Sequence, residues 1–411
     1  MNKTPKSLRL HIGIFGRTNV GKSSFLNMVA GQDIAITSPV PGTTTDVVEK
    51  IMELLPVGPV VFLDTAGIDD ISVLAEKRIE RTKKIFDRVD IIILIVEPDL
   101  WGEYEEKIID EANKRNTPFV IAVNKADIKY PSEEFLKMIK DKTQRIIVCS
   151  SIDLLSRDKY VDQLKKYFLE IPVESIFKEQ AIIGDLIPKG GFAVLIIPID
   201  KEAPKGRIIL PQVQTIRDIL DFDSSCVVVK ETEYKKTLQS FKSMPDIVVC
   251  DSQVVDKMVN ETPKEIKCTT FSMLFARHRG DLIESVKGVK TLDKLKQSDR
   301  ILIAEACSHH AIEDDIGRIK IPKWIRDYMG FDIKIDVCSG RDYPDNLGEY
   351  KLIVHCGGCM ITRREMFFRM HRAIQAGVPM TNYGVCISYI RGVLKRVLSP
   401  FPDVLKVLEN S

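Results

Sequence analysis

The chain has 411 residues, too many for one ordinary hydrophobic core, so its length predicts two or three domains. Its 60 lysine and arginine residues stand against 58 aspartate and glutamate residues, and this balance excludes the basic excess that is typical of nucleic-acid-binding and membrane-surface proteins. No apolar run is long enough to span a bilayer, and the N-terminus lacks a secretory pattern. We therefore expect a cytoplasmic protein without nucleic-acid or membrane partners, whose 9 cysteines are reduced and available to metal.

A phosphate-binding loop is predicted close to the N-terminus. Residues 16–23 read G-x-x-x-x-G-K-S, directly after a stretch that predicts a strand and directly before one that predicts a helix. In that context the loop backbone and the helix N-terminus bind phosphates, Lys22 reaches the β- and γ-phosphate oxygens, and the Ser23 hydroxyl binds Mg²⁺. The expected nucleotide-binding residues here are Gly16, Asn19, Val20, Gly21, Lys22, Ser23 and Ser24.

Two further segments are expected to contact the γ-phosphate and its metal. Residues 41–46 form a loop in which the Thr44 hydroxyl can meet Mg²⁺. Residues 60–67 predict a strand followed by Asp-x-x-Gly, in which Asp64 would hold a metal-bound water and the Gly67 N–H would sense the γ-phosphate. The predicted Mg²⁺ ligands are therefore Ser23, Thr44 and Asp64.

The sequence Asn-Lys-x-Asp at Asn124, Lys125 and Asp127 predicts the identity of the base. A carboxylate at Asp127 can accept from N1–H and the 2-amino group of guanine, which adenine does not offer. Ser150 and Ser151 end another predicted strand, where a backbone N–H usually contacts guanine O6. These elements, in this order, predict an enzyme that binds and hydrolyses GTP.

Residues 8 to about 170 resemble the translation-factor-like GTPases of the Era and TrmE type. In such enzymes a hydrophobic residue, here Ile68, replaces the catalytic glutamine of Ras. TrmE-like relatives bind K⁺ through a P-loop asparagine and orient the attacking water through a glutamate of the switch II helix. The matching positions are Asn19 and Glu76, although Glu76 could equally be one solvated charge on a helix face. The resemblance thus implies the catalytic residues Lys22, Glu76 and Asn19.

The rest of the chain alternates short apolar runs with helical segments, which predicts further α/β structure. Pro172 ends a helical stretch, so we place the first domain boundary there. We expect a P-loop GTPase domain with a parallel-type sheet in residues 1–171, followed by two smaller α/β domains. Residues 172–265 carry no charge constellation or nucleotide loop, so a spacer or dimerisation role is favoured, and residues 266–411 form the last domain.

A metal site is predicted in that last domain. Cys307 follows the apolar run 301–304, and Cys356 and Cys359 follow the run 350–354 with two glycines between them. If both runs are buried strands, the sulfurs meet where two strands end on one side of a sheet. A redox pair or disulfide at Cys356 and Cys359 is the alternative. The remaining thiols are not expected to bind metal: Cys149, Cys226, Cys250, Cys268, Cys338 and Cys386.

The pattern Cys307-Ser308-His309, then His355-Cys356-Gly357-Gly358-Cys359, fused to a TrmE-like GTPase, resembles the HydF family of [FeFe]-hydrogenase maturation GTPases over the whole chain. The resemblance implies a homodimeric scaffold that binds GTP, Mg²⁺, K⁺ and a [4Fe–4S] cluster. It also implies a transient diiron precursor, assembled with the radical-SAM enzymes HydE and HydG and passed to the apo-hydrogenase HydA. The implied cluster ligands are Cys307, Cys356 and Cys359.

The fourth cluster ligand stays open among Glu305, His309 and His355. Three thiolates leave one iron of a cubane for an exchangeable ligand, and a histidine can equally donate to a cluster sulfur from outside the ligand set. Two other kinds of protein also remain open. One is a zinc-structured regulatory GTPase, because Cys₃His suits zinc as well, and the other is an RNA- or ribosome-associated GTPase.

Overall fold

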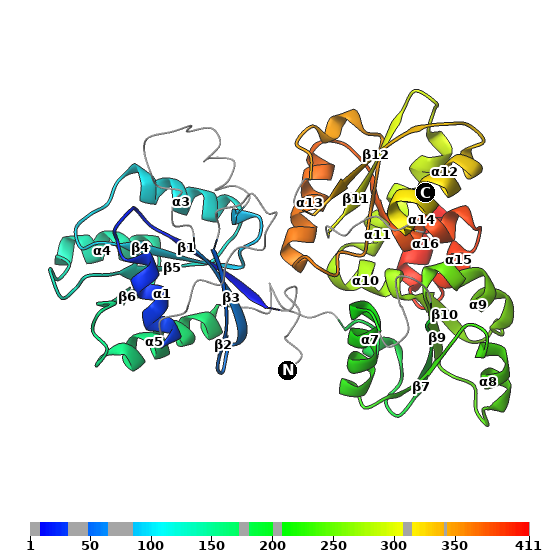
Figure 1. Ribbon diagram of the computed structural model, residues 1–411, viewed down its shortest axis with the longest axis horizontal. Coiled ribbons are helices and arrows are strands. Elements are labelled where there is room, and N and C mark those ends of the chain that lie inside the picture. The colour runs from blue at the N-terminus through cyan, green and yellow to red at the C-terminus, as the bar shows by residue number, and fades with distance from the viewer. Residues whose placement is uncertain are drawn as a thin grey trace. The chain divides into compact units, whose positions relative to one another are not determined.

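The computed structural model describes residues 9–31, 48–64, 85–171, 181–199, 208–306, 315–340 and 343–410, without the side chains of Val48 and Asp64. The chain divides into two compact units, Met1–Lys178 and Glu179–Ser411. In both units Figure 1 shows helices packed around β-strands. Both units are therefore α/β, as the alternation of apolar runs and helical segments predicted.

The first unit is built on a 6-stranded sheet in the order β2-β3-β1-β4-β5-β6. Strand β2 runs antiparallel to β3, and the other pairs are parallel. The predicted parallel-type sheet is thus confirmed. Its described elements are β1 (Leu10–Phe15), α1 (Lys22–Ala30), β2 (Val48–Leu54), β3 (Gly58–Asp64), β4 (Ile91–Val96), α3 (Glu103–Lys114), β5 (Phe119–Val123), α4 (Glu133–Lys142), β6 (Ile146–Val148) and α5 (Arg157–Glu170).

Helices cover both faces of this sheet. Strands β1, β4 and β5 are buried at every position, as parallel strands between two helical layers must be. Phe25 of α1 and Phe168 of α5 pack in the core on one face, while Ile108 of α3 and Phe135 of α4 pack on the other. The carboxyl ends of the parallel strands open onto one edge, which is where ligands bind in open α/β sheets.

The second unit contains two 4-stranded parallel sheets, in the orders β10-β9-β7-β8 and β12-β11-β13-β14. In each sheet the second strand along the chain lies on one side of the first (β8 beside β7, β12 beside β11), and the third lies on the other side (β9 and β13). The strand order therefore switches between β7 and β9 and between β11 and β13. The main elements are β7 (Phe192–Ile196), α7 (Leu210–Asp221), β8 (Ser225–Val229), α8 (Tyr234–Ser240), β9 (Ile247–Cys250), α9 (Val255–Glu261), β10 (Lys267–Thr270), α10 (Phe271–Arg279), α11 (Leu282–Val289), β11 (Arg300–Glu305), α12 (Ile321–Met329), β12 (Lys334–Ser339), β13 (Leu352–His355), α13 (Arg363–Gln375), β14 (Met380–Asn382), α14 (Tyr383–Ile390), α15 (Leu394–Val397) and α16 (Pro402–Asn410).

One hydrophobic core joins these two sheets. It includes Val194 and Val248 of the β10-β9-β7-β8 sheet, Ile301 and Val354 of the β12-β11-β13-β14 sheet, and Phe275 of α10. Helix α10 contacts β10 of the one sheet, helix α14 contacts β13 and β14 of the other, and the two helices contact each other. Strand β10 begins after the boundary that we expect at residues 265/266, yet it pairs with β9. The two sheets are therefore parts of one compact unit, and they divide in sequence after β10.

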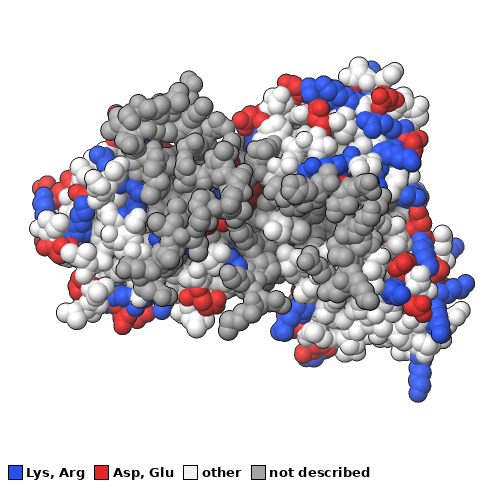
Figure 2. Space-filling model, viewed as in Figure 1, with Lys and Arg blue, Asp and Glu red and all other residues white. Residues whose placement is uncertain are grey.

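Charges of both signs are mixed on the surface. Figure 2 shows lysine and arginine side chains interspersed with aspartate and glutamate on the visible face. Exposed pairs such as Lys107–Glu103 and Arg217–Asp221 contribute little stability, because water screens them. In the part of the chain that is described, we find no helix with the length and apolar character needed to cross a membrane.

Candidate functional site

The predicted phosphate-binding loop connects β1 to α1. Asn19 and Gly21 have φ angles of +66° and +92°. Backbone in this region turns successive N–H groups toward one point, an arrangement that binds anions. A Cβ atom at Gly21 would lie 2.4 Å from Nδ2 of Asn124, so the close approach of these two segments requires glycine.

Lys22 is the first residue of α1, and its side chain is buried. Its ammonium group donates to the carbonyl oxygens of Gly16 at 2.6 Å and Arg17 at 2.9 Å. The cation is thereby held over the loop, at the helix end that favours anions. Ser23 and Ser24 are exposed in the same helical turn. The predicted loop residues thus come together at one helix N-terminus.

Helix α3 anchors this loop through a contact that the motif did not predict. Nε and Nη2 of Arg17 donate to the two carboxylate oxygens of Glu105 at 2.7 and 2.6 Å. The Glu105 side chain is buried, and this hydrogen-bonded pairing raises the pKa of Arg17. A forked guanidinium–carboxylate pair fixes orientation as well as distance. No local pattern identifies the pair, because its members are 88 positions apart.

The predicted base-reading residues lie at the carboxyl ends of β5 and β6. Asn124 is buried and connects them to the phosphate loop, because its Nδ2 donates to the Val20 carbonyl oxygen at 2.8 Å. Its Oδ1 accepts from the backbone N–H and the hydroxyl of Ser151 at 2.9 and 2.8 Å. Ser150 is buried beside it, and Asp127 is exposed with its carboxylate open to solvent. Lys125, at a φ of +64°, pairs with Glu97.

Several predicted nucleotide residues lie outside the described part of the chain. These residues are Thr44, Gly67 and Glu76. The backbone of Asp64 ends β3, in register with Ile14 of β1, and its side chain is not described. The Mg²⁺ shell and the water-orienting glutamate therefore stay predictions.

We call residues 356–361, which contain Cys356 and Cys359, the cysteine loop. It begins at the strand-order switch of the third sheet, β12-β11-β13-β14. Ala304 of β11 is in register with His355 of β13, so the chain leaves both strands at the same edge. The Cys356 N–H donates to the Ala304 carbonyl oxygen at 2.9 Å, and the Ala306 N–H donates to the Cys356 sulfur at 3.1 Å. Ala306 immediately precedes Cys307, which lies outside the described residues together with His309. The two segments that carry the predicted cysteines thus run side by side.

The loop has the shape and surroundings that suit a buried metal cluster. Gly358 has a φ of +63°, and a Cβ atom there would lie 2.4 Å from Cε of Met366. Both Cys356 and Cys359 are free thiols, so no disulfide joins them. Apolar side chains surround the loop, and hydrogen bonds from backbone N–H groups to sulfur are a known feature of iron–sulfur sites. Within the described ranges no three His, Cys, Asp or Glu side chains form a metal-binding group.

The candidates for a fourth ligand have polar partners where they are described. Nδ1 of His355 donates to the Cys356 carbonyl oxygen at 2.7 Å, and its Nε2 accepts from Nη1 of Arg369 at 3.2 Å. Burial, together with the Arg369 charge, lowers the pKa of His355 to about 3, so the ring is neutral. Glu305 accepts from Nε of Arg318 at 3.1 Å. These contacts leave neither ring nitrogen of His355 free.

Cys359 lies in an environment with opposing effects on its thiol. Burial raises the pKa of Cys359, and the nearby Arg279 guanidinium lowers it. Burial alone raises the pKa of Cys149 and Cys386 to about 12. Those two cysteines are therefore buried core thiols with little thiolate.

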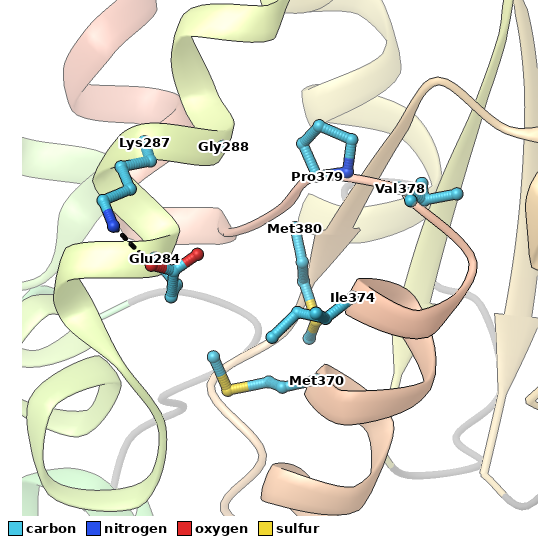
Figure 3. A pocket seen from close by; sticks show the side chains of 9 residues that line it. Glu284, Lys287, Gly288, Met370, Ile374, Val378, Pro379 and Met380 are labelled. Atoms are coloured by element: carbon cyan, nitrogen blue, oxygen red, sulfur yellow. Dashed lines mark hydrogen bonds and ion pairs between the residues drawn. The ribbon is translucent and has the colours of Figure 1, made fainter. Parts of the chain in front are cut away.

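A groove of about 270 Å³ opens close to the cysteine loop. In Figure 3, Met370 and Ile374 extend from α13 toward α11, which carries the Glu284–Lys287 pair. Met370 and Met380 line this groove and also a smaller cavity that reaches Cys356. The two thioether side chains therefore stand between the groove and the loop.

A guanine-nucleotide loop on a mostly parallel sheet, followed by two further parallel sheets, defines a P-loop GTPase with additional α/β modules. Three protein families match the chain: "50S ribosome-binding GTPase" over residues 11–125, "Hydrogen maturase F dimerization domain" over 182–280, and "Hydrogen maturase F tetramerization domain" over 283–400. The chain belongs to the hydrogen maturase F (HydF) family. The predicted GTPase activity and P-loop fold are thereby confirmed, and GTP and Mg²⁺ are its ligands.

The chain is similar to several GTPases. The GTPase Era of Thermoanaerobacter sp. (strain X514) is 32% identical over 240 residues, which cover 54% of this chain and 76% of that protein. The tRNA modification GTPase MnmE of Caldicellulosiruptor saccharolyticus is 36% identical over 128 residues, 30% of this chain and 28% of that protein. A crystal structure of Aquifex aeolicus Era has 19% identity and a TM-score of 0.32, covering 56% of this chain and 98% of that one.

Proposed function

We propose that this protein is a GTP-hydrolysing scaffold that holds a [4Fe–4S] cluster and carries the diiron precursor of the [FeFe]-hydrogenase active site to the apo-enzyme. The observation that carries the proposal is the hydrogen bond from the Ala306 N–H to the Cys356 sulfur. It joins the loop of Cys356 and Cys359 to the segment that continues into Cys307. Membership of the maturase family supplies the reaction context.

In the GTPase unit, each described residue has a role set by its position. Lys22 neutralises the phosphates at the start of α1, and Ser23 supplies a hydroxyl ligand to Mg²⁺. Asn124 joins the phosphate loop to the base segment, and Asp127 accepts from guanine. Asn19, exposed on the loop, would bind K⁺, which supplies positive charge in place of an arginine finger, and Glu76 would orient the attacking water.

In the second unit, Cys307, Cys356 and Cys359 would hold the cluster. Bound through three thiolates, such a cluster offers one iron to an exchangeable ligand. The residues of this chain shape the setting: Gly358 turns the loop, Ala306 donates to a thiolate, and Met366 with its apolar neighbours excludes water. HydE and HydG would provide the diiron precursor, and HydA would receive it.

Self-association is expected of a chain with dimerization and tetramerization domains. In the described part of the second unit, β8 and β12 are edge strands without a buried position, whereas the edge strands β10 and β14 are mostly buried. The exposed backbone of an edge strand can pair with another strand. Val228 of β8 and Val337 of β12 are more than 40% exposed, at 44% and 42%. We propose that a homodimer forms by pairing at β8, within the dimerization domain.

Metal identity is the observation that tests this function against its alternatives. The purified protein is reconstituted anaerobically, either with iron and sulfide or with Zn²⁺. A brown protein whose visible absorbance bleaches on reduction is the expected result. A colourless protein that takes up zinc and rejects iron would favour a zinc-structured regulatory GTPase. Tight, salt-dependent binding of ribosomal RNA by the colourless protein would favour the RNA-associated alternative.

A further inference from the structure

Two buried arginines reach the cysteine loop from different helices. Arg279 is the last residue of α10 and Arg369 lies in α13, and their exposed fractions are 2% and 3%. Removing a guanidinium from water is costly unless it is hydrogen-bonded. The bonds that each arginine makes therefore indicate what the chain gains by burying it.

Arg369 reaches Cys356 through His355. Its Nη1 donates to Nε2 of His355 at 3.2 Å, and Nδ1 of the same ring donates to the Cys356 carbonyl oxygen at 2.7 Å. The tautomer with the proton on Nδ1 is the one that satisfies both contacts. Nη2 of Arg369 donates to the Gly340 carbonyl oxygen and to the Glu365 carboxylate. The Arg369 guanidinium thus orients the His355 imidazole, and the Glu365 carboxylate neutralises the positive charge of the guanidinium.

Arg279 fixes the other end of the loop. Its Nη1 donates to the Ile361 carbonyl oxygen at 2.9 Å, two residues after Cys359. Its guanidinium also lies over the Phe275 ring, 5.9 Å from the ring centroid. Ile361 in turn donates its N–H to the Gly358 carbonyl oxygen. One arginine therefore acts at the start of the cysteine loop and the other at its end.

We propose that Arg369 and Arg279 are positioning residues for the cluster-binding loop, and that His355 acts through the Cys356 carbonyl oxygen instead of as an iron ligand. This inference rests on the proposed cluster function and deepens it. A lysine ammonium cannot reproduce the forked hydrogen bonds of Arg369, and at Arg279 it lacks the planar guanidinium that bonds Ile361 and lies over Phe275. The fourth iron position is then left to Glu305, His309 or an exogenous ligand.

The test uses the full chain reconstituted with iron and sulfide. The variants are Arg369→Met, Arg369→Lys, Arg279→Met and Arg279→Lys. Matched controls come from the same helices: Arg372→Met, whose guanidinium contacts Pro344 and Asp345, and Arg277→Met, whose guanidinium contacts Ala181 and Asp185. We measure the rate at which a ferrous chelator removes the cluster, together with the EPR spectrum of the reduced protein.

The positioning variants should lose the cluster about 10- to 100-fold faster than the parent protein. Mutating residues that hydrogen-bond to metal ligands typically lowers metal affinity by about this factor. The two controls should match the parent. If a methionine variant does not fold, as its melting curve would show, the lysine variant at the same position decides. Equal release rates in the lysine variants, the controls and the parent would overturn the inference.

The role of His355 has its own readout. With ¹⁵N-labelled histidine and no added imidazole, any coupling to a directly bound histidine nitrogen in pulsed EPR of the reduced cluster should persist in His355→Ala, because it would come from His309. A coupling that disappears in His355→Ala would show that His355 is a ligand and overturn this part. A parent protein that takes up no iron and sulfide on reconstitution would instead refute the cluster function itself. The two failures are therefore distinguishable.

Discussion

Nδ2 of Asn124 donates to the carbonyl oxygen of Val20 at 2.8 Å, so one buried residue joins the base-reading segment to the phosphate-binding loop. Gly21 makes this approach possible, because a Cβ atom there would lie 2.4 Å from the same nitrogen. The separation of the two halves of the nucleotide site is thus set by a contact within the protein.

Asn124→Ala should weaken GTP and GDP binding together. The change leaves the buried partners of the amide without hydrogen bonds, at a cost of about 1–3 kcal/mol, which is about 5- to 150-fold in affinity if all of it appears in binding. Titration with fluorescent GTP and GDP analogues measures the loss. Asn113→Ala, an exposed position on α3, serves as the control. A loss confined to GTP would contradict the structural role of Asn124.

Asp127→Asn should shift the preference from GTP toward xanthosine triphosphate. The amide replaces an acceptor pair with one donor and one acceptor, so a guanine N–H loses its partner. We expect GTP affinity to fall by about 5- to 150-fold, from about 1–3 kcal/mol per unmatched group. Competition binding with both nucleotides measures the shift, with Asp141→Asn on α4 as an exposed control. Unchanged GTP selectivity would refute the assignment of Asp127 as the base reader.

Asn19→Gly should abolish stimulation of GTP hydrolysis by K⁺ relative to Na⁺. Glycine accepts the φ of +66° at this position without strain, so the variant removes the side chain and spares the loop. Initial rates in the two salts, with nucleotide affinity as the control measurement, decide the outcome. Equal rates in both salts for the parent protein would remove the basis for a K⁺ site.

Gly358→Ala should impair cluster binding, and Gly357→Ala should not. The backbone φ of +63° at Gly358 costs an alanine about 1–2 kcal/mol. Its Cβ would also lie 2.4 Å from Cε of Met366, which would have to move. Among the described residues other than its chain neighbours, no atom lies within 4 Å of a Cβ added at Gly357. Iron content after identical reconstitution compares the two variants. Equal iron content in both would show that the loop does not need this turn.

The first unit was predictable because its signals are local. A strand, a glycine loop and a helix follow one another within residues 10–30, and the structure places β1, the loop and α1 there. The apolar runs before Cys307 and Cys356 likewise predicted β11 and β13, which pair in parallel and bring both segments to one edge. Short-range pattern was sufficient in these places because strand and helix formation depend on neighbouring residues.

The rest of the site depends on contacts between residues far apart in sequence. Arg279 reaches Ile361 across 82 positions, and Arg17 reaches Glu105 across 88. Neither arginine stands out from other charged residues in the sequence, because the burial of Arg279 and the pairing of Arg17 with Glu105 arise only when the helices pack. The core shared by the second and third sheets was missed for the same reason, since its residues come from segments far apart in the sequence. These features require tertiary packing.

The central claim is that Cys307, Cys356 and Cys359 hold a redox-active iron–sulfur cluster in a GTPase. The most direct measurement is iron and sulfide content, with EPR of the reduced protein, for single Cys→Ser variants after anaerobic reconstitution. Serine at position 307, 356 or 359 should remove most of the cluster signal, whereas Cys338→Ser and Cys386→Ser should leave the parent spectrum. An unchanged spectrum in the first three variants, or loss of the cluster in Cys338→Ser, would contradict this ligand set.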